Sequence, residues 1–293
     1  MPGRANSKRA IIETYLAKDF GVVKSCHAME IAISTYYYNA KPRADEGWIV
    51  SQIEDVLTKL GPTGYIAMTA ILRRTTEIGD KKVYRIMREN GLLCQKKKKI
   101  YSKTTDSAHS LPKHQNFAST FVTSDLGQVL VVDVTQFDIR GRDCFLALLM
   151  DRHNLEIAGA AISWSNDTSL VLSALEAASE KYGNLNGCIH HTDADVRYCS
   201  NEYTGKLWDL GIDISMTVGN VYENAHAESL NKTIKYKEIN LNEYDSIEEA
   251  WVRIGIYIQN YNTFKPHSSL NWMTPVEYKM CVQNKKMIPI SGG

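Results

Sequence analysis

A nearly continuous apolar run with one acidic residue inside it constrains the fold of this chain more than any other feature. Residues 128–137 read QVLVVDVTQF, which predicts a strand buried on both faces and therefore a sheet covered by helices on both sides. Asp133 lies in the middle of this run. An ionised carboxylate in such a place costs several kcal/mol unless it is paired or bound to a metal. The sequence therefore predicts a central strand whose carboxylate needs a partner.

The segments after this strand alternate between strand and helix patterns. Residues 144–150 and 157–164 predict two further strands, and the short links between them favour an antiparallel meander. Asp167 then caps a helix that runs to about residue 182. The remaining pattern is a strand over 187–192, a helix over 201–210, a strand over 212–216 and two closing helices over 224–237 and 246–261. This order predicts an α/β fold, a ribonuclease H-like mixed five-stranded sheet with flanking helices.

The first third of the chain has helical patterns only, in two groups of three. Residues 1–45 predict short helices over 8–18, 24–31 and 35–39, the last capped by Ser34. Residues 46–95 predict helices over 48–60, 66–74 and 81–90, the last capped by Asp80 and closed by Gly91. Both groups are typical of helix-turn-helix units. We expect five parts: 1–45, 46–95 (a DNA-binding domain), 96–125 (a basic linker), 126–262 (a catalytic core) and 263–293 (a C-terminal tail motif).

Charge is divided unevenly between the two halves. Residues 1–115 hold 20 Lys and Arg against 11 Asp and Glu, a net charge of +9, and the remainder has a net charge of −8. A basic first part favours polyanion binding, although solvated surfaces would give the same imbalance. The cationic surface of the helix over 81–90 and the basic run that follows it are the candidate DNA-binding residues: Lys81, Lys82, Arg85, Arg88, Lys96, Lys97, Lys98 and Lys99.

Two further carboxylates lie where they can join Asp133. Asp193 ends the short strand CIHHTD, and Glu228 lies in the helix NAHAESLNKTIK on one face with Asn224, Lys232 and Lys235. Three carboxylates are hard oxygen ligands, which suit Mg²⁺ or Mn²⁺, and two such ions can promote displacement at a phosphodiester. The two lysines could hold nucleic-acid phosphates. His190 and His191 are interpreted as structural.

An ordered set of motifs resembles transposases of the insertion-sequence-three family, in particular the protein of their second reading frame, and more distantly retroviral integrases. The first helix-turn-helix corresponds to CHAMEIAISTYYY, and the second to GPTGYIAMTAIL with KKVYRIMRENGLL. The segments VVDVTQF, HTD and GNVYENAHAESLNKTIKYKEI carry the Asp-Asp-Glu triad, and YNTFKPHSSLNWMTPVEY carries the closing motif. The resemblance implies that Asp133, Asp193 and Glu228 are catalytic and hold Mg²⁺ or Mn²⁺ as two ions, with supporting roles for Asn224 and His267.

The chain departs from the family pattern in three places. Asp193 and Glu228 enclose 34 residues where about 35 are usual, and the missing position is expected near residues 218–220. The loop after Asp193 reads ADVRY in place of RGSQY, so that Asp195 becomes a rival second carboxylate. The usual Arg before His267 is absent, and Lys265 lies nearby.

Three hypotheses follow. The first is a Mg²⁺-dependent transposase that cleaves DNA and transfers strands. The second is a decayed or domesticated relative that binds DNA without chemistry. The third is a nuclease for RNA–DNA hybrids, which two helix-turn-helix units and the lack of a fourth clear carboxylate disfavour. The resemblance implies as partners the terminal inverted repeats and target DNA, other copies of the chain on DNA, and an upstream-frame subunit or fusion.

Composition excludes several other classes of protein. No stretch approaches 18 apolar residues, and the first ten residues lack the apolar core of a secretory signal. The six cysteines form no CxxC pair and are typical of reduced intracellular thiols. We therefore expect a cytoplasmic protein without a membrane partner, and the resemblance implies a bacterial one associated with the nucleoid.

Overall fold

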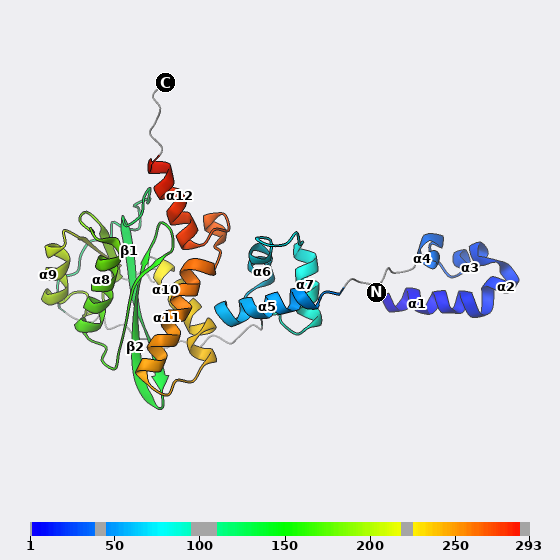
Figure 1. Cartoon of the computed structure of the whole chain (residues 1–293), viewed down its shortest axis with the longest axis horizontal. Coiled ribbons are helices and arrows are strands. Elements are labelled where there is room, and N and C mark those ends of the chain that lie inside the picture. Colours follow the sequence, from blue (N-terminus) through cyan, green and yellow to red (C-terminus); the bar gives the residue numbers. More distant parts are fainter. Residues whose placement is uncertain (1, 39–44, 95–109, 218–224, 288–293) are drawn as a thin grey trace, which may run out of the picture. The chain divides into compact units, whose positions relative to one another are not determined.

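The computed structural model describes residues 2–38, 45–94, 110–217 and 225–287. The chain forms two compact units, Met1–Trp48 and Ile49–Gly293 (Figure 1). None of the described helices combines the length and the hydrophobicity that crossing a membrane requires. All six cysteines are free thiols, as the sequence predicts.

The first unit is entirely helical. It contains α1 (Pro2–Ile11), the π-helical η1 (Ile12–Leu16), α2 (Ala17–Phe20), α3 (Val22–Ala28) and α4 (Ile33–Tyr37). Ile12, Cys26 and Tyr36 form its small core. We expected Ser34 to be the N-cap of the last helix, but Ala32 has this position. The carbonyl of Ala32 already accepts from the N–H groups of Thr35 and Tyr36. The helix therefore begins two residues earlier than expected, at Ile33.

The second unit opens with three helices around one apolar core: α5 (Gly47–Leu60), α6 (Tyr65–Leu72) and α7 (Asp80–Glu89). Gly79 is the N-cap of α7, and Asp80, expected as the cap, is its first residue and lies 3.4 Å from Arg73. Gly91 closes α7 as predicted, with φ of 69° and a hydrogen bond of 2.7 Å from the N–H of Leu92 to the carbonyl of Met87.

The five-stranded mixed sheet predicted from the sequence follows. Its strands are β1 (Val129–Ile139), β2 (Arg142–Asp151), β3 (Ile157–Ser163), β4 (Ile189–Asp193) and β5 (Asp213–Thr217), in the order β3-β2-β1-β4-β5. The first three form an antiparallel meander, and β1, β4 and β5 are parallel. β1 is thus the central strand, with one antiparallel and one parallel neighbour.

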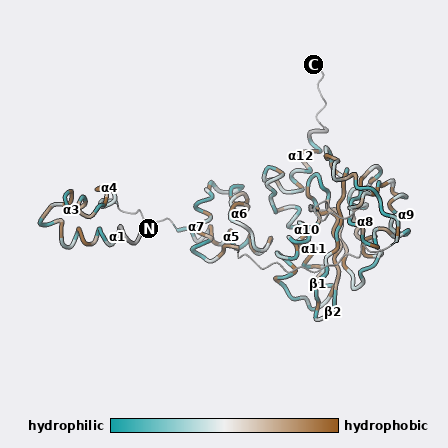
Figure 2. Tube along the Cα trace, turned by 180° about the vertical axis from the view of Figure 1, so that it is seen from behind, coloured by the Kyte–Doolittle hydropathy of each residue, from teal (hydrophilic) through white to brown (hydrophobic). Residues whose placement is uncertain are grey.

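Helices cover both faces of the sheet, which explains the continuous apolar run in β1. Even-numbered residues such as Leu130 and Val132 pack toward α8 (Thr168–Tyr182) and α9 (Asn201–Asp209). Odd-numbered residues such as Val129 and Val131 pack toward α10 (Ala225–Lys237) and α11 (Ile247–Phe264). Figure 1 shows α8 and α10–α11 on opposite sides of the sheet, and Figure 2 shows the hydrophobic strands between them.

The C-terminal segment contains more structure than the sequence predicted. After the short η3 (Ile239–Leu241) and η4 (Ser268–Leu270), the chain forms α12 (Pro275–Met287). The N–H of Glu277 donates to the Thr274 hydroxyl, and the N–H of Thr274 donates to the Glu277 carboxylate, at 3.2 and 2.8 Å. This capping box starts the helix, and Pro275 occupies the first helical position, where its missing N–H costs nothing.

Candidate active site

Asp133 and Asp193 lie level with each other on neighbouring strands. Val131 of β1 pairs with His191 of β4 in the parallel register, and each aspartate lies two residues further along its strand. Because side chains alternate with a period of two, Asp133 shares a sheet face with Val131, and Asp193 shares one with Ile189. Val131 and Ile189 both pack toward α10 and α11. The two carboxylates therefore meet beneath the same helical layer.

α10 brings a third carboxylate to this face. Its residues Ala227, Leu230 and Ile234 are buried against the sheet, which holds the helix in place. Glu228 follows Ala227 directly and is partly exposed, with its Oε2 3.4 Å from Nζ of Lys232. Asn231, one helical turn after Glu228, is 7% exposed, and neither atom of its amide forms a hydrogen bond among the described residues.

The electrostatics of Asp133 show that these groups act on one another. Burial, followed by the charge of Asp193 and more weakly by that of Glu228, raises the pKa of Asp133 to about 7. The Asn231 amide and the N–H of Val134, which donates to Asp133 at 2.8 Å, oppose this shift. A carboxyl group whose pKa is raised toward neutral pH by burial and by other carboxylates is a typical feature of a functional site.

Asp195, the rival second carboxylate, has a different role. It is buried, and its Oδ1 accepts from both the backbone N–H and the Nε of Arg197, the latter at 2.5 Å. Arg197 also donates to Asn166, which precedes α8. The buried ion pair between Asp195 and Arg197 thus stabilises the altered loop, and it occupies the carboxylate of Asp195. Asp193 remains the better candidate for the site.

Hard oxygen donors are present, and they fit a divalent cation chemically. Among residues 2–38, 45–94, 110–217 and 225–287, no three His, Cys, Asp or Glu side chains are arranged so that they could hold a metal ion. Asp133 and Asp193 nevertheless repel each other in a buried setting, and a bound divalent cation would relieve both charges. The buried Asn231 amide, which acts on Asp133, adds an oxygen that could hydrogen-bond to a water molecule at the site.

The two lysines of α10 differ in their surroundings. Lys232 is exposed and pairs with Glu228 at 3.4 Å. Lys235 is half-buried; burial lowers its pKa, whereas the charge of Asp133 raises it. Lys235 is therefore the lysine whose charge is coupled to the buried aspartate. Asn224, expected on the same face, lies outside the described residues, as do residues 218–220.

The two histidines of β4 are structural, in agreement with their interpretation from the sequence. His190 is fully buried, with Nε2 2.7 Å from the Tyr203 hydroxyl, and burial lowers its pKa to about 3. His191 lies 3.1 Å from the Ser215 hydroxyl and 3.0 Å from the Thr217 hydroxyl on β5. A neutral imidazole with hydroxyl partners on β5 or α9 fixes the position of the strand that ends in Asp193.

The candidate DNA-binding residues are partly within the described structure. Lys81, Lys82 and Arg88 are exposed on α7, and Arg85 donates to Glu89 at 2.7 Å. The run of four lysines, Lys96, Lys97, Lys98 and Lys99, lies outside the described residues. His267 lies after α11, where its ring is 3.1 Å from Nζ of Lys265. Within the described part of the chain, no hydrogen bond joins it to Asp133 or Asp193.

Sequence reasoning missed two features of the site. The first is Asn231, a buried polar partner of Asp133. It follows Glu228 by three residues on α10, so helical spacing could have indicated that the two side chains lie near each other. The second is Lys237, the last residue of α10, whose pKa burial lowers. In the sequence Lys237 is one of several lysines in a basic helix, and no pattern indicated that its side chain would be buried and not exposed to solvent.

Comparison with known proteins identifies the family of the chain. Family models match residues 125–219 and 210–275 as an integrase core domain and residues 49–99 as an HTH-like domain. The chain is 30% identical over 205 residues to the insertion element IS600 uncharacterized 31 kDa protein of Shigella sonnei, covering 69% of this chain and 75% of that protein. It is 29% identical over 261 residues to the putative transposase InsK for insertion sequence element IS150 of Escherichia coli, covering 86% and 91%.

Among solved structures, a chain of the simian T-cell lymphotropic virus intasome is similar with a TM-score of 0.48 and 16% identity, covering 74% of this chain and 70% of that one. The transposase for insertion sequence element IS629 of Shigella sonnei is 27% identical over 277 residues, covering 89% and 92%. On these family models and relatives, the chain belongs to the insertion-sequence transposases with an integrase core.

Proposed function

We propose that this chain is a DNA transposase that cleaves the ends of its element and joins them to target DNA by in-line attack on phosphodiesters. One observation carries the proposal: Asp133 and Asp193 lie level on adjacent strands beneath α10, where burial, the charge of Asp193 and, more weakly, that of Glu228 raise the pKa of Asp133 to about 7. Two carboxylates on adjacent strands, with a third on the basic helix that covers them, suit phosphodiester chemistry better than proton transfer alone.

Asp133, Asp193 and Glu228 would hold Mg²⁺ or Mn²⁺, as two ions. When bound, the ions supply Lewis-acid activation of the attacking and leaving oxygens. An ionised carboxylate binds a cation far better than a neutral carboxyl group, so Asp133 must lose its proton before it can serve as a ligand. Burial favours the neutral form, and the Val134 N–H and the Asn231 amide favour the charged form.

The remaining residues of α10 position the DNA. Lys232 is exposed beside Glu228 and can reach a phosphate near the scissile bond. Lys235, coupled to Asp133, would place a second positive charge deeper in the site. We assign Asn224 and His267 supporting roles in the same reaction, the former from its place just before α10 and the latter from the C-terminal motif.

DNA recognition is assigned to the helical parts of the chain. We propose that 1–45 and 46–95 bind the terminal inverted repeats, with 96–125 as a basic linker, 126–262 as the catalytic core and 263–293 as the tail motif. In the HTH-like domain, the exposed Lys81, Lys82 and Arg88 suit phosphate contacts beside a groove. The assembly would contain several copies of the chain on DNA and an upstream-frame subunit or fusion.

Strand joining on the element's own terminal repeats tests the proposal. Wild-type protein should join ends in Mg²⁺ and not in EDTA, whereas Asp133→Asn, Asp193→Asn and Glu228→Gln should bind the repeats and join nothing. A decayed, binding-only relative would bind equally well and show no joining by the wild type in Mg²⁺ or Mn²⁺. Wild-type joining rates in the three variants would contradict the assignment of the carboxylates.

A further inference from the structure

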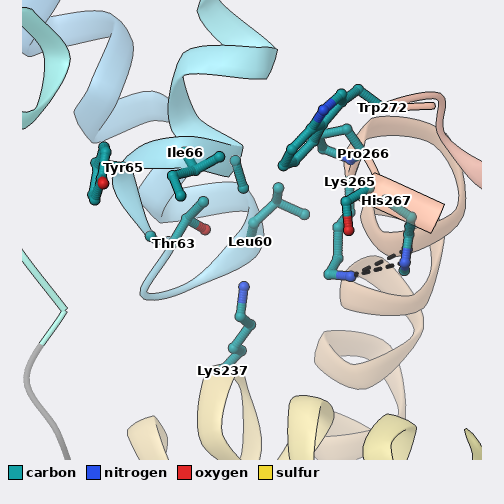
Figure 3. A pocket seen from close by; sticks show the side chains of 12 residues that line it. Leu60, Thr63, Tyr65, Ile66, Lys237, Lys265, Pro266, His267 and Trp272 are labelled. Atoms are coloured by element: carbon teal, nitrogen blue, oxygen red, sulfur yellow. Dashed lines mark hydrogen bonds between the residues drawn. The ribbon is translucent and has the colours of Figure 1, made fainter. Parts of the chain in front are cut away.

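A second candidate site lies within the unit Ile49–Gly293, away from the carboxylates. A pocket of about 430 Å³ separates the turn between α5 and α6 from the end of α10 and the segment after α11. Figure 3 shows Lys237 pointing toward that turn, and Lys265 beside His267 on the opposite wall. The pocket is bounded by parts of the HTH-like domain and parts of the integrase core.

The pocket gathers positive charge without a negative partner. Of the residues that line it, Lys237, Lys265 and His267 can carry a positive charge, and none is Asp or Glu. Nζ of Lys265 lies 3.1 and 3.4 Å from the two ring nitrogens of His267. Among the described residues, neither Lys237 nor Lys265 forms an ion pair with a carboxylate within 4.0 Å. Three basic groups therefore share one half-buried space.

Burial and the neighbouring charges both disfavour protonation of these groups. Burial, then the charge of Lys237, lowers the pKa of Lys265 to about 7. Burial, then Lys265 and Lys237, lowers the pKa of His267 to about 3. Burial and the neighbouring lysine thus disfavour the charged form of Lys265, whose ammonium lies beside the neutral ring of His267. An anion that enters the pocket would favour the charged forms of both lysines.

The start of α6 faces the same space. Gly64 is the N-cap of this eight-residue helix and has no side chain that could accept from the first N–H groups. Gly64, Tyr65, Ile66 and Ala67 all line the pocket. The first N–H groups of a helix have no partner within the helix and carry the positive end of its dipole, so they attract anions.

We infer that this pocket binds a phosphate group of the DNA backbone, held by Lys237, Lys265, His267 and the start of α6. The inference rests on the proposed function, since it takes the ligand from the DNA on which the transposase acts. Two features of the pocket favour a backbone phosphate over a small free anion. The HTH-like domain supplies one wall, and α10, which carries Glu228 and Lys235, supplies the other.

A phosphate in this position would connect DNA binding to the catalytic helix. The two walls already approach closely, because a Cβ on Gly61 would lie 2.3 Å from the carbonyl oxygen of Lys237. Arg74 of the HTH-like domain also forms two hydrogen bonds to the Glu277 carboxylate of α12, at 2.8 and 2.9 Å. The bound phosphate would add a third link between these parts, at the end of α10 opposite to Glu228.

The test uses the full chain with Lys237→Met, Lys265→Met and the double variant, because Met keeps the length of the buried stem. Lys206→Met on α9 is the matched control: it removes the same charge from a residue that lies 3.7 Å from Glu176 and outside the pocket. Binding to a terminal-repeat duplex is measured over a range of salt concentrations, and urea unfolding of each variant confirms that it folds.

Each pocket variant should bind about tenfold more weakly, as expected for one charge-assisted phosphate contact. The slope of log affinity against log salt should fall by about one unit, and the control should keep the wild-type slope. A duplex with one neutral methylphosphonate, moved along the backbone, should weaken wild-type binding at one position and have no further effect there on the double variant.

Three results would overturn the inference. The double variant could bind with wild-type affinity and salt slope, or the methylphosphonate effect could persist unchanged in it. Alternatively, inorganic phosphate could raise the melting temperature of the wild type and not of the double variant while DNA binding stays equal, which would assign the pocket to a free anion. Failure of the proposed function looks different: either the wild type would join no ends in Mg²⁺ or Mn²⁺, or Glu228→Gln would join them at the wild-type rate, whatever the pocket does.

Discussion

Replacement of Asp133 by Asn should stabilise the metal-free protein at neutral and alkaline pH. Burial and the charges of Asp193 and Glu228 raise the pKa of Asp133 to about 7. An aspartate in an unfolded chain titrates near 3.9, so the folded state binds this proton about three pH units more tightly. The ionised side chain therefore opposes folding, and Asn at the same place removes the charge while keeping the shape.

The sign of the effect follows from which state holds the proton. Below pH 4, Asp133 is protonated in both states and contributes no pH dependence. Between pH 4 and pH 7 the unfolded chain releases the proton while the folded protein retains it, so stability falls as pH rises. Above pH 7 the loss is complete. Three units at about 1.4 kcal/mol each give at most about 4 kcal/mol.

Urea unfolding in EDTA, followed by tryptophan fluorescence, measures this difference. The free energy of unfolding of Asp133→Asn minus that of the wild type should be near zero at pH 4 and rise to a few kcal/mol by pH 8. Subtraction removes the titration of every other group that behaves alike in both proteins. Mg²⁺ should then stabilise the wild type at pH 8 and have little effect on the variant.

The reasoning would be refuted if Asp133→Asn were less stable than the wild type at pH 8 in EDTA. It would also be refuted if the difference in unfolding free energy between the two proteins did not change between pH 4 and pH 8. Either result would mean that Asp133 is already compensated in the folded protein, and the argument for a cation at this position would fail.

Three further predictions follow from the same structure. Asp195→Asn should lower the free energy of unfolding by about 3 kcal/mol, because it leaves the buried Arg197 unpaired. The variant should retain strand joining at temperatures where it is folded. Loss of joining by the folded variant would show that Asp193 is wrongly assigned. Simultaneous replacement of Lys81, Lys82, Arg85 and Arg88 by Ala should weaken binding to terminal repeats and reduce the dependence of the affinity on salt. Unchanged binding at both low and high salt would contradict a role for α7. Lys235→Ala should slow joining more than Lys232→Ala, because Lys235 alone is coupled to Asp133; equal rates for both variants in a single-turnover assay would count against it.

The order of the elements was predictable because it depends on residue patterns that act over short distances. The apolar run around Asp133 predicted the central strand. The run is continuous because alternate side chains of this strand pack into two different cores. Asp167 was correctly predicted to cap α8, since its carboxylate accepts from the N–H of Ser169. The helix α12 was missed although Thr274-Pro275-Val276-Glu277 is a capping-box sequence, because the segment was interpreted only as a motif.

The candidate site was less predictable where it depends on contacts between distant residues. That Asp133 and Asp193 lie level depends on the register of β1 with β4, which no local pattern fixes. The pairing of Asp195 with Arg197 was equally hidden, although it decides between two aspartates two residues apart. The pocket with Lys237 and Lys265 joins residues more than 170 positions from the turn at Gly61, so only the folded chain could show it.

The most direct test of the central claim is a change of metal preference at Asp193. Thiolate sulfur is a softer ligand than carboxylate oxygen, so Asp193→Cys should lose strand joining in Mg²⁺ and recover part of it in Mn²⁺. Asp195→Cys should show no such exchange, because Asp195 contacts Arg197. Joining by Asp193→Cys at the wild-type rate in Mg²⁺, or recovery in Mn²⁺ by Asp195→Cys alone, would contradict a metal-dependent site built on Asp133, Asp193 and Glu228.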